Sequence, residues 1–191
     1  MNTRHLVAAA SIAGAVVIGL PAVAQAAPVV PAQAILAANE FPFGSVEYKV
    51  SSDIGAPPVK VTGDSSCERA SYDLDKRLEG AKSTDAEAVR GSSKLEASVN
   101  DRPMADAMRT VFRVCGAELG VQLAIAPLPA DLSRYNGFVF LSESRDSAIG
   151  VVDVRGAAVG VSVDGRGNQP ADTDAFWQIL RAQVAKVERQ P

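Results

Sequence analysis

The stretch "SAIGVVDVRGAAVGVSVDG", residues 147–165, constrains the fold more than any other part of the sequence. Two apolar runs flank Arg155 and Gly156, and the glycine can supply the positive φ that a tight turn requires. The runs consist almost entirely of small and β-branched residues, which are typical of buried strands. The stretch therefore predicts an antiparallel hairpin of central strands, with helices covering one face of the sheet.

Five further strands are predicted before residue 147. Residues 41–52 alternate, with Val46, Tyr48 and Val50 on one side and polar residues on the other, as in a half-buried strand. A short strand is predicted at 57–63, after a Pro-Pro turn. Thr84 and Glu87 indicate a short helix, followed by a strand at 95–99. Residues 121–129 and 135–144 are also expected to be strands.

Two predicted amphipathic helices each carry one of the two cysteines. Residues 65–80 begin with a capping box of Ser65 and Glu68, and Cys67 lies on their apolar face. In residues 101–120 Asp101 is expected to cap the helix, and Cys115 lies on its apolar face. A closing helix over 172–190 is predicted to start at a capping Asp172 and to direct these residues inward: Phe176, Ile179, Leu180, Val184 and Val187.

The two cysteines, 48 positions apart, predict a disulfide between these helices. In the chain-entropy description, a loop of this size stabilises the fold by about 4 kcal/mol. A redox pair is the alternative, but it normally requires a C-x-x-C spacing that is absent here. The predicted fold is α+β, with an antiparallel sheet of about five or six strands, helices mainly on one face and the Cys67–Cys115 bond.

Residues 1–26 have the pattern of a secretory signal. Arg4 precedes an uncharged apolar run from Leu6 to Leu20, and small residues precede the expected cleavage after Ala26. An uncleaved anchor is the alternative, although the run is shorter than the ~20 residues that span a bilayer. Residues 27–40, rich in Ala and Pro, are expected to form a flexible lead-in to one domain at 41–190. We expect a secreted protein, which could associate with the cell wall, with no membrane span after cleavage.

The chain that follows residue 26 contains no histidine, because His5 is the only one. This argues against Ser-His and Cys-His hydrolases and against most catalytic zinc sites. We therefore expect no catalytic residues, metal or cofactor, and leave a carboxylate-based hydrolase as an alternative. With 18 basic against 22 acidic residues after residue 26, and no basic block, nucleic-acid binding is not expected.

Two features could belong to a binding surface. Arg134 and Tyr135 lie between two predicted strands, and Arg155 lies at the tip of the predicted hairpin. An arginine beside an aromatic ring can bind an anion or a second ring. The simpler interpretation is a solvated loop and a hairpin tip.

Several motifs together resemble the extracellular sensor-like domains of mycobacteria and related actinobacteria. They are "ILAANEFPFG", "SSCERA", "FRVCGAEL", "VDVRGAAVGVSV" and "FWQILRAQVAKV", which span residues 35–188. Such domains occur on membrane Ser/Thr kinases and as envelope lipoproteins. The resemblance implies an antiparallel sheet with packed helices and a cleft for an unidentified ligand. This chain departs from the family pattern because it has no kinase segment and no lipid-bearing cysteine.

The sequence favours a secreted, non-enzymatic binding domain of the cell envelope for a small molecule, lipid or glycan. A secreted protein-interaction module or inhibitor is the second hypothesis. An exposed apolar patch in place of a cavity would favour it. The carboxylate-based hydrolase is the third hypothesis, and it requires acidic groups that converge in a cleft.

Overall fold

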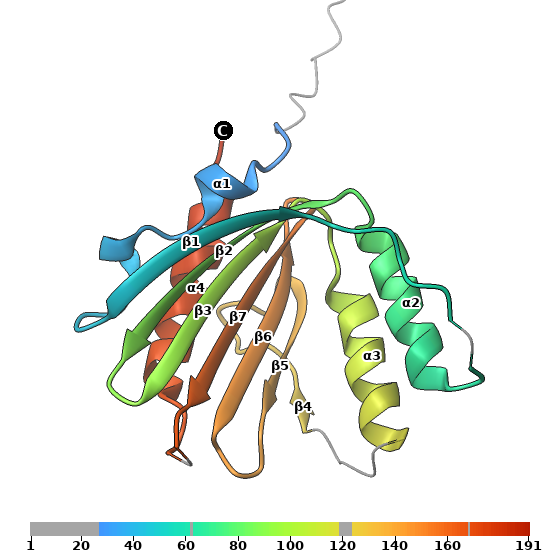
Figure 1. Cartoon of the computed structure of the whole chain (residues 1–191). Coiled ribbons are helices and arrows are strands. Elements are labelled where there is room, and N and C mark those ends of the chain that lie inside the picture. Colours follow the sequence, from blue (N-terminus) through green and yellow to red (C-terminus); the bar gives the residue numbers. More distant parts are fainter. Residues whose placement is uncertain (1–26, 62, 119–123, 168) are drawn as a thin grey trace, which may run out of the picture.

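A seven-stranded antiparallel sheet forms the centre of the protein (Figure 1). The computed structural model describes residues 27–61, 63–118, 124–167 and 169–191. The spatial strand order is β1-β2-β3-β7-β6-β5-β4. The predicted α+β class is confirmed, but the sheet has seven strands where about five or six were predicted. The strands are β1 (Val46–Ile54), β2 (Lys82–Arg90), β3 (Ser93–Asn100), β4 (Ile125–Ala126), β5 (Asn136–Leu141), β6 (Ser147–Val154) and β7 (Ala157–Gly165).

The predicted hairpin is confirmed as β6 and β7, which pair from Val154 opposite Ala157 onward. Both turn residues have positive φ, Arg155 at 52° and Gly156 at 78°. This is the backbone of a type I′ turn, whose twist matches that of the flanking strands. Strand β7 lies between β3 and β6, so the hairpin is central as its composition predicted.

Residues 82–100 form a second hairpin, so the prediction of a short helix from Thr84 and Glu87 is wrong. Strands β2 and β3 pair from Arg90 opposite Ser93, across a turn in which Gly91 has φ of 57°. Thr84, Ala86 and Ala88 are buried while the residues between them are not. This period of two is the signature of a strand, and it overrides the apparent capping box.

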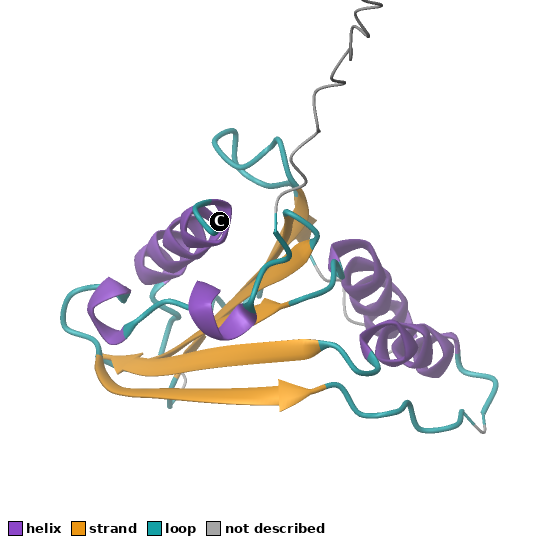
Figure 2. Cartoon of the chain, turned by 90° about the horizontal axis from the view of Figure 1, so that it is seen from above, coloured by secondary structure: helices purple, strands orange, loops and turns teal. Residues whose placement is uncertain are grey.

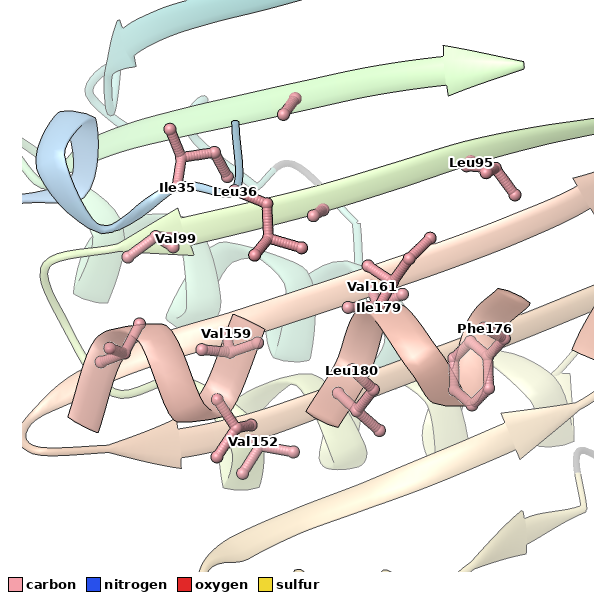
Figure 3. Packing of buried hydrophobic residues seen from close by; sticks show 14 of the residues in the cluster. Ile35, Leu36, Leu95, Val99, Val152, Val159, Val161, Phe176, Ile179 and Leu180 are labelled. Carbon is pink, nitrogen blue, oxygen red and sulfur yellow. The ribbon is translucent and has the colours of Figure 1, made fainter. Parts of the chain in front are cut away.

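One face of the sheet is covered by helix α4 (Thr173–Glu188), whose apolar side packs into the main core (Figure 3). Asp172 caps this helix, because its carboxylate accepts the Ala175 N–H over 3.0 Å. All five residues predicted to face inward are buried. In Figure 3, Phe176, Ile179 and Leu180 of α4 lie against the strands that carry Val152, Val159 and Val161.

Helices α2 (Ser66–Leu78) and α3 (Ala105–Glu118) pack together beside the sheet, and the predicted disulfide joins them (Figure 1). The Cα atoms of Cys67 and Cys115 are 4.6 Å apart. Helix α3 contacts Phe138 and Val151, whereas the adjacent residues Val139 and Val152 face the α4 side. Since neighbouring strand residues point to opposite faces, the helices are divided between both faces of the sheet, contrary to expectation.

The N-terminus of α3 is capped by a residue that the sequence analysis did not select. The Asp153 carboxylate on β6 accepts the backbone N–H groups of Met104 (2.9 Å) and Ala105 (3.1 Å). Asp101, the expected cap, instead accepts the N–H of Lys82 over 3.0 Å. Helix α3 is therefore fixed to the sheet at its first turn.

Residues 27–40 pack on the sheet, which corrects the expectation of a flexible lead-in. Helix α1 (Pro31–Ala34) and the 3-10 helix η1 (Ala38–Glu40) belong to this segment. Val29, Ala34, Ile35 and Leu36 are buried in the main core with α4. The burial of these side chains against α4 and the sheet makes this segment part of the folded domain.

Two other predicted strands differ from the structure. Residues 57–61 form no regular element, and the strand expected at 121–129 is confined to Ile125–Ala126 among its described residues. Proline within a predicted strand removes a ladder donor, which accounts for the absence of a strand after Pro57 and Pro58. The signal segment 1–26 lies outside the described residues. No helix in the described ranges is long and apolar enough to cross a membrane.

Candidate interaction surface at strand β1

A surface groove of about 420 Å³ lies where α1 meets the end of the β1–β2 pair. Three elements line it, and we call it the β1 groove. Its lining residues are Val30, Pro31, Ala32, Ser52, Asp53, Ile54, Lys82, Ser83 and Thr84. The groove is open to solvent and its lining is mainly apolar, with a hydroxyl pair, Ser52 and Thr84, joined over 2.9 Å.

Helix α1 is held in place at this groove by side chains from α4 and β1. Gln183, fully buried on α4, donates to the Ala34 carbonyl over 2.7 Å and accepts the Leu36 N–H over 3.0 Å. The Tyr48 hydroxyl on β1 donates to the Leu36 carbonyl over 2.7 Å. Its ring packs edge-on against Phe41, with the centroids 5.6 Å apart. The wall of the groove is therefore built by long-range contacts.

Strand β1 exposes large apolar side chains along its length, and Ile54 among them lines the groove. Val46 is 56% exposed, Val50 49% and Ile54 69%. The sequence alternation predicted a half-buried strand, but β1 is almost entirely exposed. It is an edge strand, so neighbours cover it from one side only. Val30 on the other side of the groove is 47% exposed, which extends the apolar surface across the groove.

The outer edge of β1 presents unpaired backbone groups. The Gly55 N–H donates to the Ala81 carbonyl over 2.8 Å, on the register that continues β1 against β2. In an antiparallel pair the hydrogen-bonded residues alternate. The residues whose N–H and C=O groups point toward β2 are therefore Lys49, Ser51 and Asp53. Those whose groups point away from the sheet are Val50, Ser52 and Ile54.

Nothing in the described part of the chain covers this edge. In Figure 2, β1 is the outermost strand, and no helix or strand lies beyond it. The opposite edge of the sheet is β4, which has only two residues, whereas β1 has nine. The β1 edge is therefore the longer of the two places where the sheet can accept another strand.

The face of the sheet opposite α4 is polar over β1, β2 and β3 and carries several carboxylates. The Lys94 ammonium donates to Glu87 over 2.8 Å and to Glu96 over 3.4 Å. Its hydrogen bond to Glu87 raises the pKa of Lys94. Burial raises the pKa of Asp85, and the nearby charges of Glu96, Asp53 and Glu87 add to the increase. Asp53 also lines the β1 groove, so the acidic face borders the groove.

The structure brings together the three residues that the sequence analysis singled out for binding, at the C-terminal end of α4. The Arg134 guanidinium donates to the Tyr135 hydroxyl over 2.6 Å and to Glu188 over 2.8 Å, and it lies 4.8 Å above the Tyr135 ring. Arg155 donates to the carbonyl groups of Ala27 over 3.2 Å and Pro191 over 2.9 Å, and also to Gln190.

These contacts give the three residues a structural role. A positive charge is favourable beside the exposed carbonyls at a helix C-terminus, which explains the position of Arg155. The Arg134 guanidinium donates to the Tyr135 hydroxyl and to the Glu188 carboxylate. Ligand binding at this cluster stays a prediction. The β1 groove, by contrast, contains none of the three residues and was missed by the sequence analysis.

The described residues contain no group of three histidine, cysteine, aspartate or glutamate side chains placed to hold a metal ion. Cys67 and Cys115 are joined in the disulfide. The carboxylate-based hydrolase of the sequence analysis stays a prediction. Asp85 and the carboxylates that act on it, Glu96, Asp53 and Glu87, lie along one face of the sheet.

Comparisons with known proteins place this chain in no family. No family model and no curated protein matches it. A solved structure of an uncharacterised protein from Mycobacterium smegmatis is similar at 11% identity and a TM-score of 0.45, covering 84% of this chain and 98% of that chain. No sensor-domain family is identified by these comparisons, so the resemblance to such domains stays a prediction.

Proposed function

We propose that this protein is an exported, non-enzymatic binding domain that takes an extended polypeptide segment along strand β1. One observation carries the proposal: outward-facing backbone groups of β1 lie directly beside an apolar groove. An added strand gains main-chain hydrogen bonds from such an edge, while its alternate side chains enter flanking hollows. Val50, Ser52 and Ile54 supply the hydrogen-bonding groups in this arrangement, and the β1 groove receives the side chains.

The protein-interaction hypothesis takes precedence over the small-ligand hypothesis because of the shape of the surface. Exposed Val30, Val50 and Ile54 form an open apolar surface, which is typical of protein contacts. The volume of the groove, about 420 Å³, also lies within the range of small-molecule sites, so a small apolar ligand or lipid is the second candidate. A carboxylate-based hydrolase has less support.

A display library of random extended peptides, selected on immobilised disulfide-bonded protein, tests the proposal. We expect selected peptides to slow hydrogen exchange at the amides of Val50, Ser52 and Ile54. The Val50→Pro variant removes one outward N–H without touching the β2 ladder, and it should lose binding. Arg134→Ala, at the other candidate surface, is the control and should bind as the wild type does.

Peptides that protect other amides, or that bind Val50→Pro and wild type equally, would contradict strand addition at β1. Native mass spectrometry of protein collected from the medium, without reductant, addresses the second candidate and export together. Export predicts a chain that begins at Ala27 and lacks two hydrogens. A small bound mass that Ile54→Lys abolishes would favour a small ligand in the β1 groove.

A further inference from the structure

We infer that the strand accepted by β1 is β1 of a second copy of this chain, paired antiparallel about Ser51. The inference rests on the proposed function, because it names the partner for the same edge. A two-fold pairing of this kind would join two seven-stranded sheets into one continuous sheet. The backbone and the charges of β1 together favour one register for this pairing.

The backbone limits the possible registers. In an antiparallel pair, residues directly opposite each other share one face of the sheet, and hydrogen-bonded pairs alternate with non-hydrogen-bonded pairs. Only residues such as Val50, Ser52 and Ile54, with outward N–H and C=O groups, can form the hydrogen-bonded pairs. A two-fold axis near the middle of β1 must therefore pass through Lys49, Val50, Ser51 or Ser52.

The charges select one of these four registers. An axis at Lys49 places two lysines opposite each other, and an axis at Val50 brings Glu47, in the irregular start of β1, toward the like-charged Asp53. An axis at Ser52 pairs no charges. An axis at Ser51 places Lys49 of each copy opposite Asp53 of the other, which gives two attractive pairs. Opposite charges on directly opposed residues stabilise a strand pair, and like charges destabilise it.

The geometry of that register strengthens the two charge pairs. Lys49 and Asp53 bond inward to β2, so toward a second copy they form the non-hydrogen-bonded pairs, in which side chains lie closest. Lysine on an edge strand commonly prevents unwanted pairing. Here Lys49 opposes the register in which it would face itself and favours the register in which it faces Asp53. One residue thus contributes both specificity and attraction.

The apolar residues of β1 fit the same register. On the α1 side, Val50 of each copy lies opposite Ser52 of the other, so the pairing covers a side chain that is 49% exposed in the single chain, and Ile54, which is 69% exposed, follows along the same face.

The test is a charge swap measured by sedimentation equilibrium on the disulfide-bonded chain. We expect the wild type to shift from monomer to dimer between about 10 and about 500 µM, the range of a weak specific contact. Lys49→Glu and Asp53→Lys each create two like-charge pairs and should weaken dimerisation at least about tenfold. The double variant K49E/D53K restores both attractive pairs and should recover the dimer.

Lys76→Glu, on the exposed surface of α2, makes the same charge change away from β1 and serves as the matched control. Thermal unfolding of every variant identifies any that fail to fold. A wild type that stays monomeric at the highest concentration overturns the inference, as does a double variant that stays monomeric or a dimer unaffected by both single variants. A monomeric wild type that still binds selected peptides at β1 would leave the proposed function intact.

Discussion

Replacing Gln183 with leucine tests the claim that buried hydrogen bonds fix the wall of the β1 groove. The Gln183 side chain is fully buried and joins α4 to both the Ala34 carbonyl and the Leu36 N–H. Leucine has a similar size and no polar atoms, so the substitution removes both hydrogen bonds while largely preserving the packing. The two backbone groups then lie buried without their partner.

The magnitude follows from those two groups. Each buried backbone group that loses its partner costs about 1–3 kcal/mol, and the added apolar contact of leucine returns about 1 kcal/mol. The Leu36 carbonyl keeps its bond from Tyr48, so the loss is confined to two groups. We expect the free energy of unfolding to fall by about 1–5 kcal/mol, which corresponds to about 2–20 °C in the melting temperature of a domain of this size.

Urea unfolding followed by circular dichroism measures this change, and hydrogen exchange shows where it acts. The amides of residues 31–37 should exchange faster than those of the central strands. Gln190→Leu is the matched control, since this glutamine also contacts the N-terminal segment, but only through one longer bond of 3.4 Å to the Gln33 carbonyl. A Gln183→Leu variant as stable as Gln190→Leu would refute the argument that these bonds hold α1.

Four further outcomes are expected. Cys115→Ser removes the bond that closes a 48-position loop and should lower stability by about 4 kcal/mol, measured by urea unfolding without reductant. Asp172→Ala removes both the α4 cap and the 2.5 Å ion pair with Arg90, at a cost of about 1–2 kcal/mol, whereas Asp172→Asn should keep the cap and lose less. Asp85→Asn should raise the melting temperature at pH 7 and have little effect near pH 3. The folded-state pKa of Asp85 is raised, so stability is lost as pH rises from the unfolded-state pKa through the folded-state pKa, and a pH series of melting curves checks this sign. Ser51→Pro, which removes an inward N–H of β1, should destabilise the single chain more than Val50→Pro, which removes an outward one; equal thermal unfolding would contradict the assigned alternation.

The sequence predicted the elements whose local pattern and tertiary environment agree. The hairpin of β6 and β7 has both the turn residues and the buried strand composition, and α4 has a cap and one continuous apolar face. The Cys67–Cys115 bond was predicted because the chain has only two cysteines and begins with the pattern of a secretory signal, and both cysteines lie on predicted helices. In these regions local preference and packing favour the same structure.

The prediction failed where local pattern and context disagree. The period of two at Thr84, Ala86 and Ala88 was obscured by a chance capping spacing, and only pairing with β3 makes the strand evident. The core role of residues 27–40 depends on Gln183, which lies 147 positions beyond Leu36 in sequence. No local signal reports such a contact.

The β1 groove was inaccessible to the sequence analysis for the same reason. Its walls come from α1, β1 and β2, which are separated by long stretches of chain. The alternation in β1 suggested one buried side, because period alone does not distinguish an edge strand from an inner one. The Arg134 and Arg155 predictions rested on residue type, and their observed contacts involve the C-terminal end of α4.

Arg155 has a further consequence for the way in which the chain could be rearranged. One guanidinium nitrogen donates to the carbonyls of both Ala27 and Pro191, so these two positions lie side by side. In the fragment 27–191, a linker of a few residues could therefore join them, and new ends could be opened at the exposed turn between β5 and β6, near Glu143. Such a circular permutant would retain every strand pairing of the sheet while moving both ends of the chain to the turn that follows β5.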